Sequence, residues 1–263
     1  MSASAEQEAF LREFHRRRPG ITARAYGRGS SYAAVVRAVL GNGNRDRDRT
    51  RLADLGCGDG FLLAELRRAG FGGAMVGIDL SEAELAAART RATGAALVQA
   101  RAQALPLRDR SMDVIVSHLA FTLMADVDEV VNELARGIVP GGRFVTVVGG
   151  GPRGEDAFAG FLELARPFMT RVPRLGEVRA RSDAGLQALF ADGWTGLTID
   201  DVPVDLSGTP DEVWETMASA YELDGVDEPS LRPTFVTECE RWMRDGVVAC
   251  TMATRLVQVV RSG

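Results

Sequence analysis

Short runs of apolar residues alternate with segments in which apolar residues recur every three or four positions, from residue 51 to the end of the chain. Short runs are typical of buried strands, and the second spacing is typical of amphipathic helices. Strands are predicted at 51–55, 74–78, 96–99, 112–117, 143–148, 197–204 and 247–260. Strands and helices in alternation predict an α/β fold with a doubly wound, mainly parallel sheet.

The helices predicted between these strands each have one apolar face. They cover 60–69, 81–92, 126–137, 155–168 and 183–191, and Ser81 with Glu84 forms a capping signal for the second. Two further helices, 6–17 and 31–40, precede a polar, charged linker at 41–50. We therefore expect an N-terminal helical cap over 1–50 and a core over 51–263, with a helical insertion at 207–246 between the last two strands.

The overall composition is that of a globular protein, with 46% hydrophobic and 25% charged residues. No apolar run reaches the ~18 residues of a membrane span, so no membrane partner is expected. Glu6 and Glu8 stand where a secretory signal would have basic and then apolar residues. The three cysteines form no CxxC pair. These features favour a cytoplasmic location.

Lysine is absent from the sequence, so all 31 basic residues are arginines. A Walker A phosphate loop and Schiff-base chemistry both require a lysine, and these two classes are excluded. The net charge of −5 and the even distribution of arginines argue against a nucleic-acid partner. Arg16, Arg17 and Arg18 form the one local cluster, which is either a solvated helix face or a clamp for a carboxylate.

A glycine-rich turn, DLGCGDG from Asp54 to Gly60, links the first predicted strand to the helix that follows. Gly56, Gly58 and Gly60 remove side chains where a ligand would approach the backbone. The GxGxG spacing differs from the GxGxxG of a pyrophosphate-binding turn. A tight strand–helix connection without a ligand is the alternative interpretation.

An acidic residue, Asp79, ends the second predicted strand in the segment GIDLS, about 20 residues beyond the glycine turn. At that distance a carboxylate binds the ribose hydroxyls of a nucleoside. A role in capping the next helix is the alternative, although Ser81 already provides a cap.

These two segments resemble motifs I and II of the class I S-adenosylmethionine-dependent methyltransferases of the small-molecule type, similar to methyltransferase domains 11 and 25. The stretches ALPLRDRSMD (104–113), LARGIVPGG (134–142) and LFADGW (189–194) resemble later motifs of that family, in the family's order. The resemblance implies a seven-stranded sheet of order 3-2-1-4-5-7-6 with strand seven antiparallel. It also implies binding of S-adenosylmethionine, with S-adenosylhomocysteine as product.

The resemblance further implies which residues hold the cofactor. The glycine turn, from Asp54 through its three glycines, would line the methionine and ribose side, Asp79 would bind the ribose and Leu80 would pack on adenine. Arg101 stands where the family has an acceptor for the adenine amino group, and arginine has no acceptor. Gln103 is then the candidate acceptor and Ala102 offers its backbone, while Arg101 itself points either to the site or to solvent.

The fourth predicted strand ends at Ser117 and His118. Ligands bind at the carboxyl ends of strands in such sheets, which places Ser117 beside the cofactor and His118 near the transferred methyl group. We expect either that His118 is the general base or that it only bonds backbone or cofactor. Methyl transfer from a sulfonium often needs only alignment of the reactants.

Acceptor recognition is expected from the N-terminal helices and the 207–246 insertion, folded over the cofactor as a lid. Candidate substrate residues are Tyr26, Arg28, Trp214 and Tyr221, with core packing as the alternative for the aromatic ones.

No metal site and no Asn-Pro-Pro-Tyr-like tetrad are apparent, which favours a small-molecule oxygen or nitrogen as acceptor. The alternative is a cofactor-binding protein of this fold that does not methylate, acting as a scaffold or guiding a rearrangement. Neither the acceptor's identity nor the oligomeric state follows from the sequence.

Overall fold

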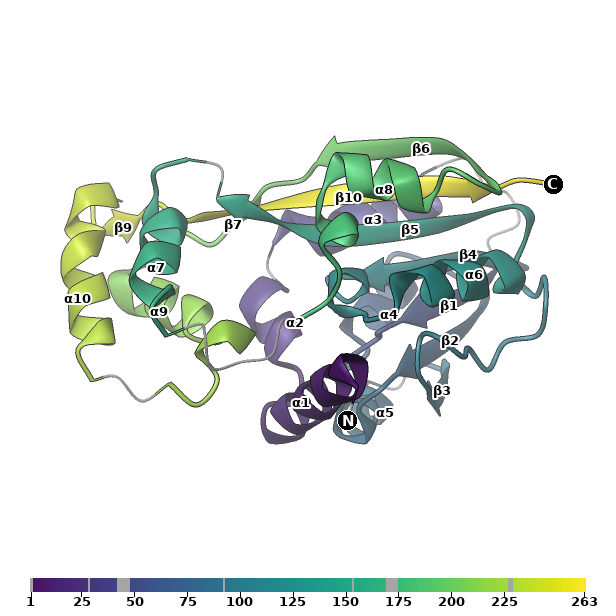
Figure 1. Cartoon of the computed structure of the whole chain (residues 1–263), viewed down its shortest axis with the longest axis horizontal. Coiled ribbons are helices and arrows are strands. Elements are labelled where there is room, and N and C mark those ends of the chain that lie inside the picture. Colours follow the sequence, from purple (N-terminus) through teal and green to yellow (C-terminus); the bar gives the residue numbers. More distant parts are fainter. Residues whose placement is uncertain are drawn as a thin grey trace.

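The computed structural model describes residues 2–27, 29–41, 48–91, 93–152, 154–168, 175–226 and 229–263. Figure 1 shows a central sheet flanked by helices, with a smaller helical lobe at one end of its longest strands. The helix α1 lies below both, beside the helix α5 of the core.

The central sheet has the order β3-β2-β1-β4-β5-β10-β6, with β7 pairing at the edge of β10. Its strands are β1 (Arg51–Leu55), β2 (Ala74–Asp79), β3 (Ala96–Gln99), β4 (Met112–His118), β5 (Ile138–Pro152), β6 (Trp194–Asp201), β7 (Val204–Asp205) and β10 (Thr251–Arg261). The pairs from β3 to β5 are parallel, and β10 runs antiparallel to β5, β6 and β7. The predicted α/β fold, strand order and antiparallel last strand are confirmed.

Helices cover both faces of the sheet. One apolar cluster joins α3 (Ser30–Leu40), α4 (Phe61–Arg68) and α5 (Glu82–Thr90) to residues such as Leu52 and Val116, and the other joins α6 (Val127–Gly137) and α8 (Asp183–Leu189) to residues such as Ala53 and Ile115. Neighbouring strand residues thus point to opposite faces, and both faces are buried. Of the predicted 1–50 cap, α3 is part of this core, whereas α1 (Ala3–Arg17) and α2 (Ile21–Tyr26) line the cavities described below.

The smaller lobe, here called the lid, has its own apolar core. It comprises α7 (Ala157–Ala165), α9 (Pro210–Met217), the 3-10 helix η4 (Tyr221–Leu223), α10 (Leu231–Glu238), the 3-10 helix η5 (Cys239–Trp242) and the hairpin of β8 (Met243–Arg244) and β9 (Val247–Val248). Phe161 of α7 packs on Phe235 of α10 with ring centroids 5.5 Å apart. The lid therefore uses a helix from between β5 and β6 in addition to the predicted 207–246 insertion.

Two further 3-10 helices are η1 (Phe121–Leu123) after β4 and η3 (Val178–Arg181) before α8. Among the described residues, no helix is both long enough and apolar enough to cross a membrane.

Candidate cofactor and acceptor site

The glycine turn after β1 has a backbone that glycine adopts readily, with φ of +72° at Gly56, +52° at Gly58 and +76° at Gly60. A Cβ atom at Gly56 would lie 2.3 Å from the Cβ of Ala120, so any side chain there would collide with the segment after β4. A Cβ at Gly60 would instead meet Ala88 at 3.1 Å. Gly56 and Gly58 line the site, whereas Gly60 lets α4 approach α5.

Asp79 ends β2 beside this turn. Its Oδ2 accepts a hydrogen bond from the Gly58 amide at 2.8 Å, and its Oδ1 accepts one from the Ser81 amide, also at 2.8 Å. Burial raises the pKa of this carboxyl group, and the two amide bonds oppose that rise. The ribose and capping interpretations are thus compatible, because Asp79 shapes the turn into α5 and still lines the cavity.

Asp54 at the end of β1 is 1% exposed, and neither of its carboxylate oxygens has a hydrogen-bond partner. Burial, with a smaller contribution from the negative charge of Asp79, raises the pKa of Asp54 to about 8. A buried acid without a partner is costly in its charged form, and a cation beside it would remove that cost. Asp54 lines the same small cavity as Gly56 and Gly58, so the residues present fit the ammonium group of a bound methionine moiety.

A cavity of about 110 Å³ extends from Asp79 along the ends of β2 and β3. Leu80, Ala102 and Gln103, which are the predicted adenine contacts, line it. Arg101 also lines it and donates to the Glu8 carboxylate of α1 at 2.8 Å, so this arginine ties the cap to the core. The Gln103 amide nitrogen is engaged with the Ala125 carbonyl at 2.6 Å.

His118 ends β4 and is 6% exposed. Its Nε2 lies 3.0 Å from the Ser31 hydroxyl, its ring stacks on Tyr32 with centroids 3.6 Å apart, and its Nδ1 has no partner. Burial lowers the pKa of His118 to about 3, which keeps the ring neutral and disfavours the cation that a base becomes. His118 lines the small cavity of about 80 Å³ with Asp54, whereas Ser117 is fully buried and lines none of the cavities described here.

A larger cavity, about 370 Å³, lies between the core and the lid. Tyr26 and Tyr221 line it among mostly apolar residues that include Phe14, Phe161 and Met252. Trp214 does not line it, because its ring packs on Phe161 and Phe235 inside the lid. Arg28, the fourth predicted substrate residue, lies outside the described residues.

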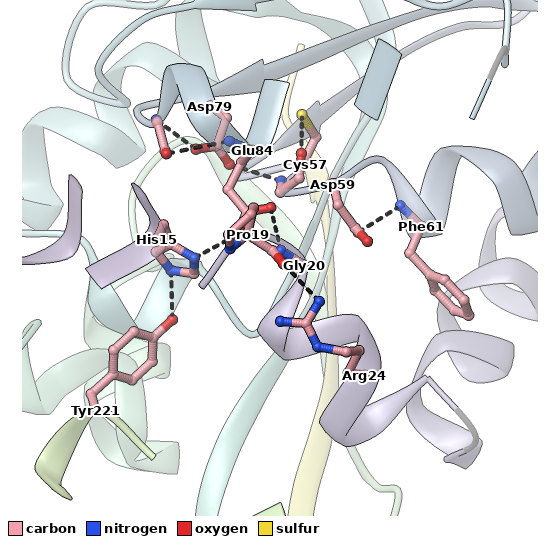
Figure 2. Close-up of polar contacts among 12 residues, drawn as sticks. His15, Pro19, Gly20, Arg24, Cys57, Asp59, Phe61, Asp79, Glu84 and Tyr221 are labelled. Carbon is pink, nitrogen blue, oxygen red and sulfur yellow. Dashed lines mark hydrogen bonds and ion pairs between the residues drawn. The ribbon is translucent and has the colours of Figure 1, made fainter. Parts of the chain in front are cut away.

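Two residues that the sequence did not single out for chemistry connect these cavities. Glu84 of α5 is 2% exposed and accepts hydrogen bonds from the Gly20 amide and from His15 Nδ1, the latter at 2.6 Å. His15 Nε2 lies 2.9 Å from the Tyr221 hydroxyl (Figure 2). The only sequence signals were the scarcity of histidine and an acidic residue on the inward face of a predicted helix.

The described residues contain no group of three His, Cys, Asp or Glu side chains placed to hold a metal ion. The three cysteines are all buried and unpaired, and burial raises the pKa of each thiol. Cys57 inside the glycine turn is thus held as a neutral thiol.

Comparison with known proteins supports the cofactor interpretation. A model of the methyltransferase domain matches residues 53–146. The bifunctional biotin biosynthesis protein BioHC of Cellvibrio japonicus is 39% identical over 106 residues, which are 40% of this chain and 21% of that protein. Demethylmenaquinone methyltransferase of Thermus thermophilus is 35% identical over 101 residues, which are 37% of this chain and 46% of that protein. The match thus spans less than half the length of these relatives.

Solved structures show the same fold over most of the chain. YcgJ of Bacillus subtilis has a TM-score of 0.61 at 18% identity and covers 89% of this chain and 98% of its own. Phosphoethanolamine N-methyltransferase 2 of Haemonchus contortus, bound to S-adenosylhomocysteine, has a TM-score of 0.59 at 16% identity. It covers 96% of this chain and 60% of its own. The cyclase SpnF has a TM-score of 0.54 at 18% identity and covers 87% of this chain and 79% of its own.

The domain match covers the glycine turn, Asp79 and the strands that hold them, and the structural matches extend the same fold through the antiparallel last strand. Residues 53–146 therefore match the methyltransferase domain, and the chain as a whole has the fold of these solved structures.

Proposed function

We propose that this chain transfers the methyl group of S-adenosylmethionine to an oxygen or nitrogen of a small, largely apolar acceptor held beneath the lid. The supporting observation is the continuity of the three cavities. The adenine-side cavity shares Gly56 and Asp79 with the small cavity, which in turn shares Thr22 and Tyr221 with the large one. A methyl donor bound in the first two cavities would meet a methyl acceptor bound in the third.

The cofactor would be held by residues of the core. Asp79 would bind the ribose, Leu80 and Ala102 would contact adenine, and Asp54 would face the ammonium group. When bound, S-adenosylmethionine supplies an electrophilic methyl group on a positively charged sulfur. The chain's own residues then have to hold the acceptor in line, exclude water and accept any proton that the acceptor releases.

The large cavity suggests the class of acceptor. Its lining is mostly aliphatic and aromatic, and among the described residues Arg181 of η3 is the one ionic side chain in it. We expect an acceptor with a hydrocarbon or aromatic body, and an anionic group would pair with Arg181.

Calorimetry with S-adenosylmethionine, S-adenosylhomocysteine and NAD tests the cofactor, and the two sulfur compounds alone should bind. Incubation of the wild type with S-adenosylmethionine and a panel of apolar phenols, acids and amines, followed by mass spectrometry, tests methyl transfer. Binding without methylation of any acceptor would favour the non-methylating alternative, since a cyclase shares this fold.

A cavity-filling variant links activity to the lid. Leu162→Trp would place an indole in the large cavity, so we expect methylation to fall while cofactor binding persists. Val247→Trp is the matched control, because Val247 lies in the lid and is 49% exposed. Equal activity in both variants would place the acceptor elsewhere.

The role of His118 as general base is a separate proposal. Its place beside the small cavity supports it, and its lowered pKa opposes it. An unchanged turnover rate of His118→Asn at saturating acceptor would discard it.

A further inference from the structure

A chain of three hydrogen-bonded side chains runs from the interior of the core to the junction of the cavities. It begins at Glu84 on α5, continues through His15 on α1 and ends at Tyr221 on η4 (Figure 2). The three residues lie far apart in the sequence, and the fold alone brings them together. Tyr221 lines both the small cavity and the large one.

The hydrogen-bond donors along this chain follow from Glu84. Both of its oxygens accept from the Gly20 amide, at 3.0 and 2.9 Å, which suits a carboxylate. A carboxylate cannot donate, so His15 Nδ1 must carry the hydrogen in that contact. In the neutral ring Nε2 is then an acceptor, and the Tyr221 hydroxyl must donate to it. The Tyr221 oxygen also has a side-chain hydrogen bond with Thr22, and one lone pair remains for a group in the cavities.

Local packing fixes this arrangement. Gly20 has φ of +71°, and a Cβ there would lie 2.8 Å from Asp59 Oδ2, so the corner between α1 and α2 fits only glycine. The Tyr221 ring packs on Phe14 with centroids 4.5 Å apart. The backbone corner and the stacked ring hold His15 between its two partners.

Both negative and positive groups lie around the chain of bonds, since Asp79, Arg12 and Arg101 line the adenine-side cavity together with His15. A charge on His15 lowers the pKa of Asp79 at the end of β2, and Tyr26 on α2 raises the pKa of Tyr221. Burial raises the pKa of Tyr221, so its phenol stays protonated and passes a proton on rather than storing a charge. A positive charge on His15 would interact favourably with Glu84, 2.6 Å away, and with the carboxylate of Asp79.

Resting on the proposed methyl transfer, we propose that Tyr221, His15 and Glu84 form a relay that removes the proton of a hydroxyl or amine acceptor. The acceptor atom bonds to the methyl carbon, and the electron pair of the broken carbon–sulfur bond stays on sulfur. The acceptor's proton passes to the Tyr221 oxygen while Tyr221's own proton passes to His15 Nε2. The positive charge lost from sulfur thus appears on His15, beside Glu84. Tyr221 is the catalytic residue, and His15 and Glu84 act through it.

One test needs no acceptor. The proton uptake that accompanies binding is measured by calorimetry near neutral pH in two buffers of different ionisation enthalpy. The neutral sulfur of S-adenosylhomocysteine should permit more proton uptake by His15 than the charged sulfur of S-adenosylmethionine. We expect that difference in the wild type and in Arg16→Gln, an exposed neighbour on α1, and its loss in His15→Gln. Equal uptake with both compounds, or a difference that persists in His15→Gln, would overturn the relay.

The second test uses an acceptor from the panel. Tyr221→Phe and His15→Gln should lower kcat about 100-fold, within the usual range for general acid–base catalysis, with a smaller change in KM. Glu13→Gln, on the exposed face of α1, should keep wild-type kcat. Wild-type kcat in Tyr221→Phe, or a loss confined to His118→Asn, would overturn the relay. Failure of S-adenosylmethionine to bind the wild type would instead refute the proposed function, and proton uptake judges the relay even where no panel member is methylated.

Discussion

Replacement of Asp54 by asparagine should stabilise the ligand-free protein near neutral pH and weaken cofactor binding. The carboxyl group is 1% exposed and has no partner, and its pKa is raised to about 8. In the unfolded chain the same group ionises at its ordinary pKa near 4. The contribution of Asp54 to stability is therefore fully present below about pH 4 and is lost as the pH rises toward about 8.

The size of this effect follows from the two pKa values. At pH 7 Asp54 is ionised in the unfolded chain but largely protonated in the folded one, and at about 1.4 kcal/mol for each pKa unit this costs the folded state roughly 4 kcal/mol. Asparagine cannot ionise, but its amide also lacks a partner, which costs about 1–3 kcal/mol. We expect Asp54→Asn to be more stable than the wild type by roughly 1–3 kcal/mol at pH 7 and less stable at pH 4.

Urea unfolding of the ligand-free proteins at several pH values measures this difference. Asp113→Asn is the matched control, because the Arg51 guanidinium lowers the pKa of Asp113 and its contribution is lost as the pH falls. That partly exposed pair should contribute under about 1 kcal/mol. The reasoning would be refuted by a stability difference between Asp54→Asn and the wild type that does not depend on pH. A wild type more stable than Asp54→Asn at pH 8 would also refute it.

Other substitutions test the site and the lid. Gly56→Ala should abolish cofactor binding and lower the unfolding temperature, because its Cβ would lie 2.3 Å from Ala120, whereas Gly58→Ala has its nearest atom at 3.8 Å and should be milder in thermal unfolding. Asp79→Ala should weaken S-adenosylmethionine binding about 10- to 100-fold by calorimetry through the loss of a charged hydrogen-bond acceptor, and near-normal affinity would contradict a ribose contact. Phe161→Ala should cost about 3–5 kcal/mol in urea unfolding, since it is fully buried between lid helices, and a loss below 1 kcal/mol would mean that the lid is loosely packed.

The sequence by itself determined the sheet and the cofactor turn. Short apolar runs marked the strands, so β1, β2, β3 and β4 were predicted within a residue of their bounds. The positions of Gly56 and Asp79 followed from local chemistry, because a positive φ and a carboxylate at a strand end are properties of single residues. β5 was predicted too short and the 210–246 segment too uniformly helical, since pairing with β10 and packing inside the lid set their bounds.

Only the tertiary structure decided the contact partners of the remaining candidate residues. Trp214 looked like a candidate for an acceptor pocket, but Phe161 and Phe235 surround it in the lid. Arg101 lines the adenine-side cavity while it pairs with Glu8 of α1. His15 and Glu84 are 69 residues apart in the sequence and 2.6 Å apart in the fold. Local patterns record the burial of a residue but not its partners, since long-range contacts depend on how α1, α5 and the lid pack together.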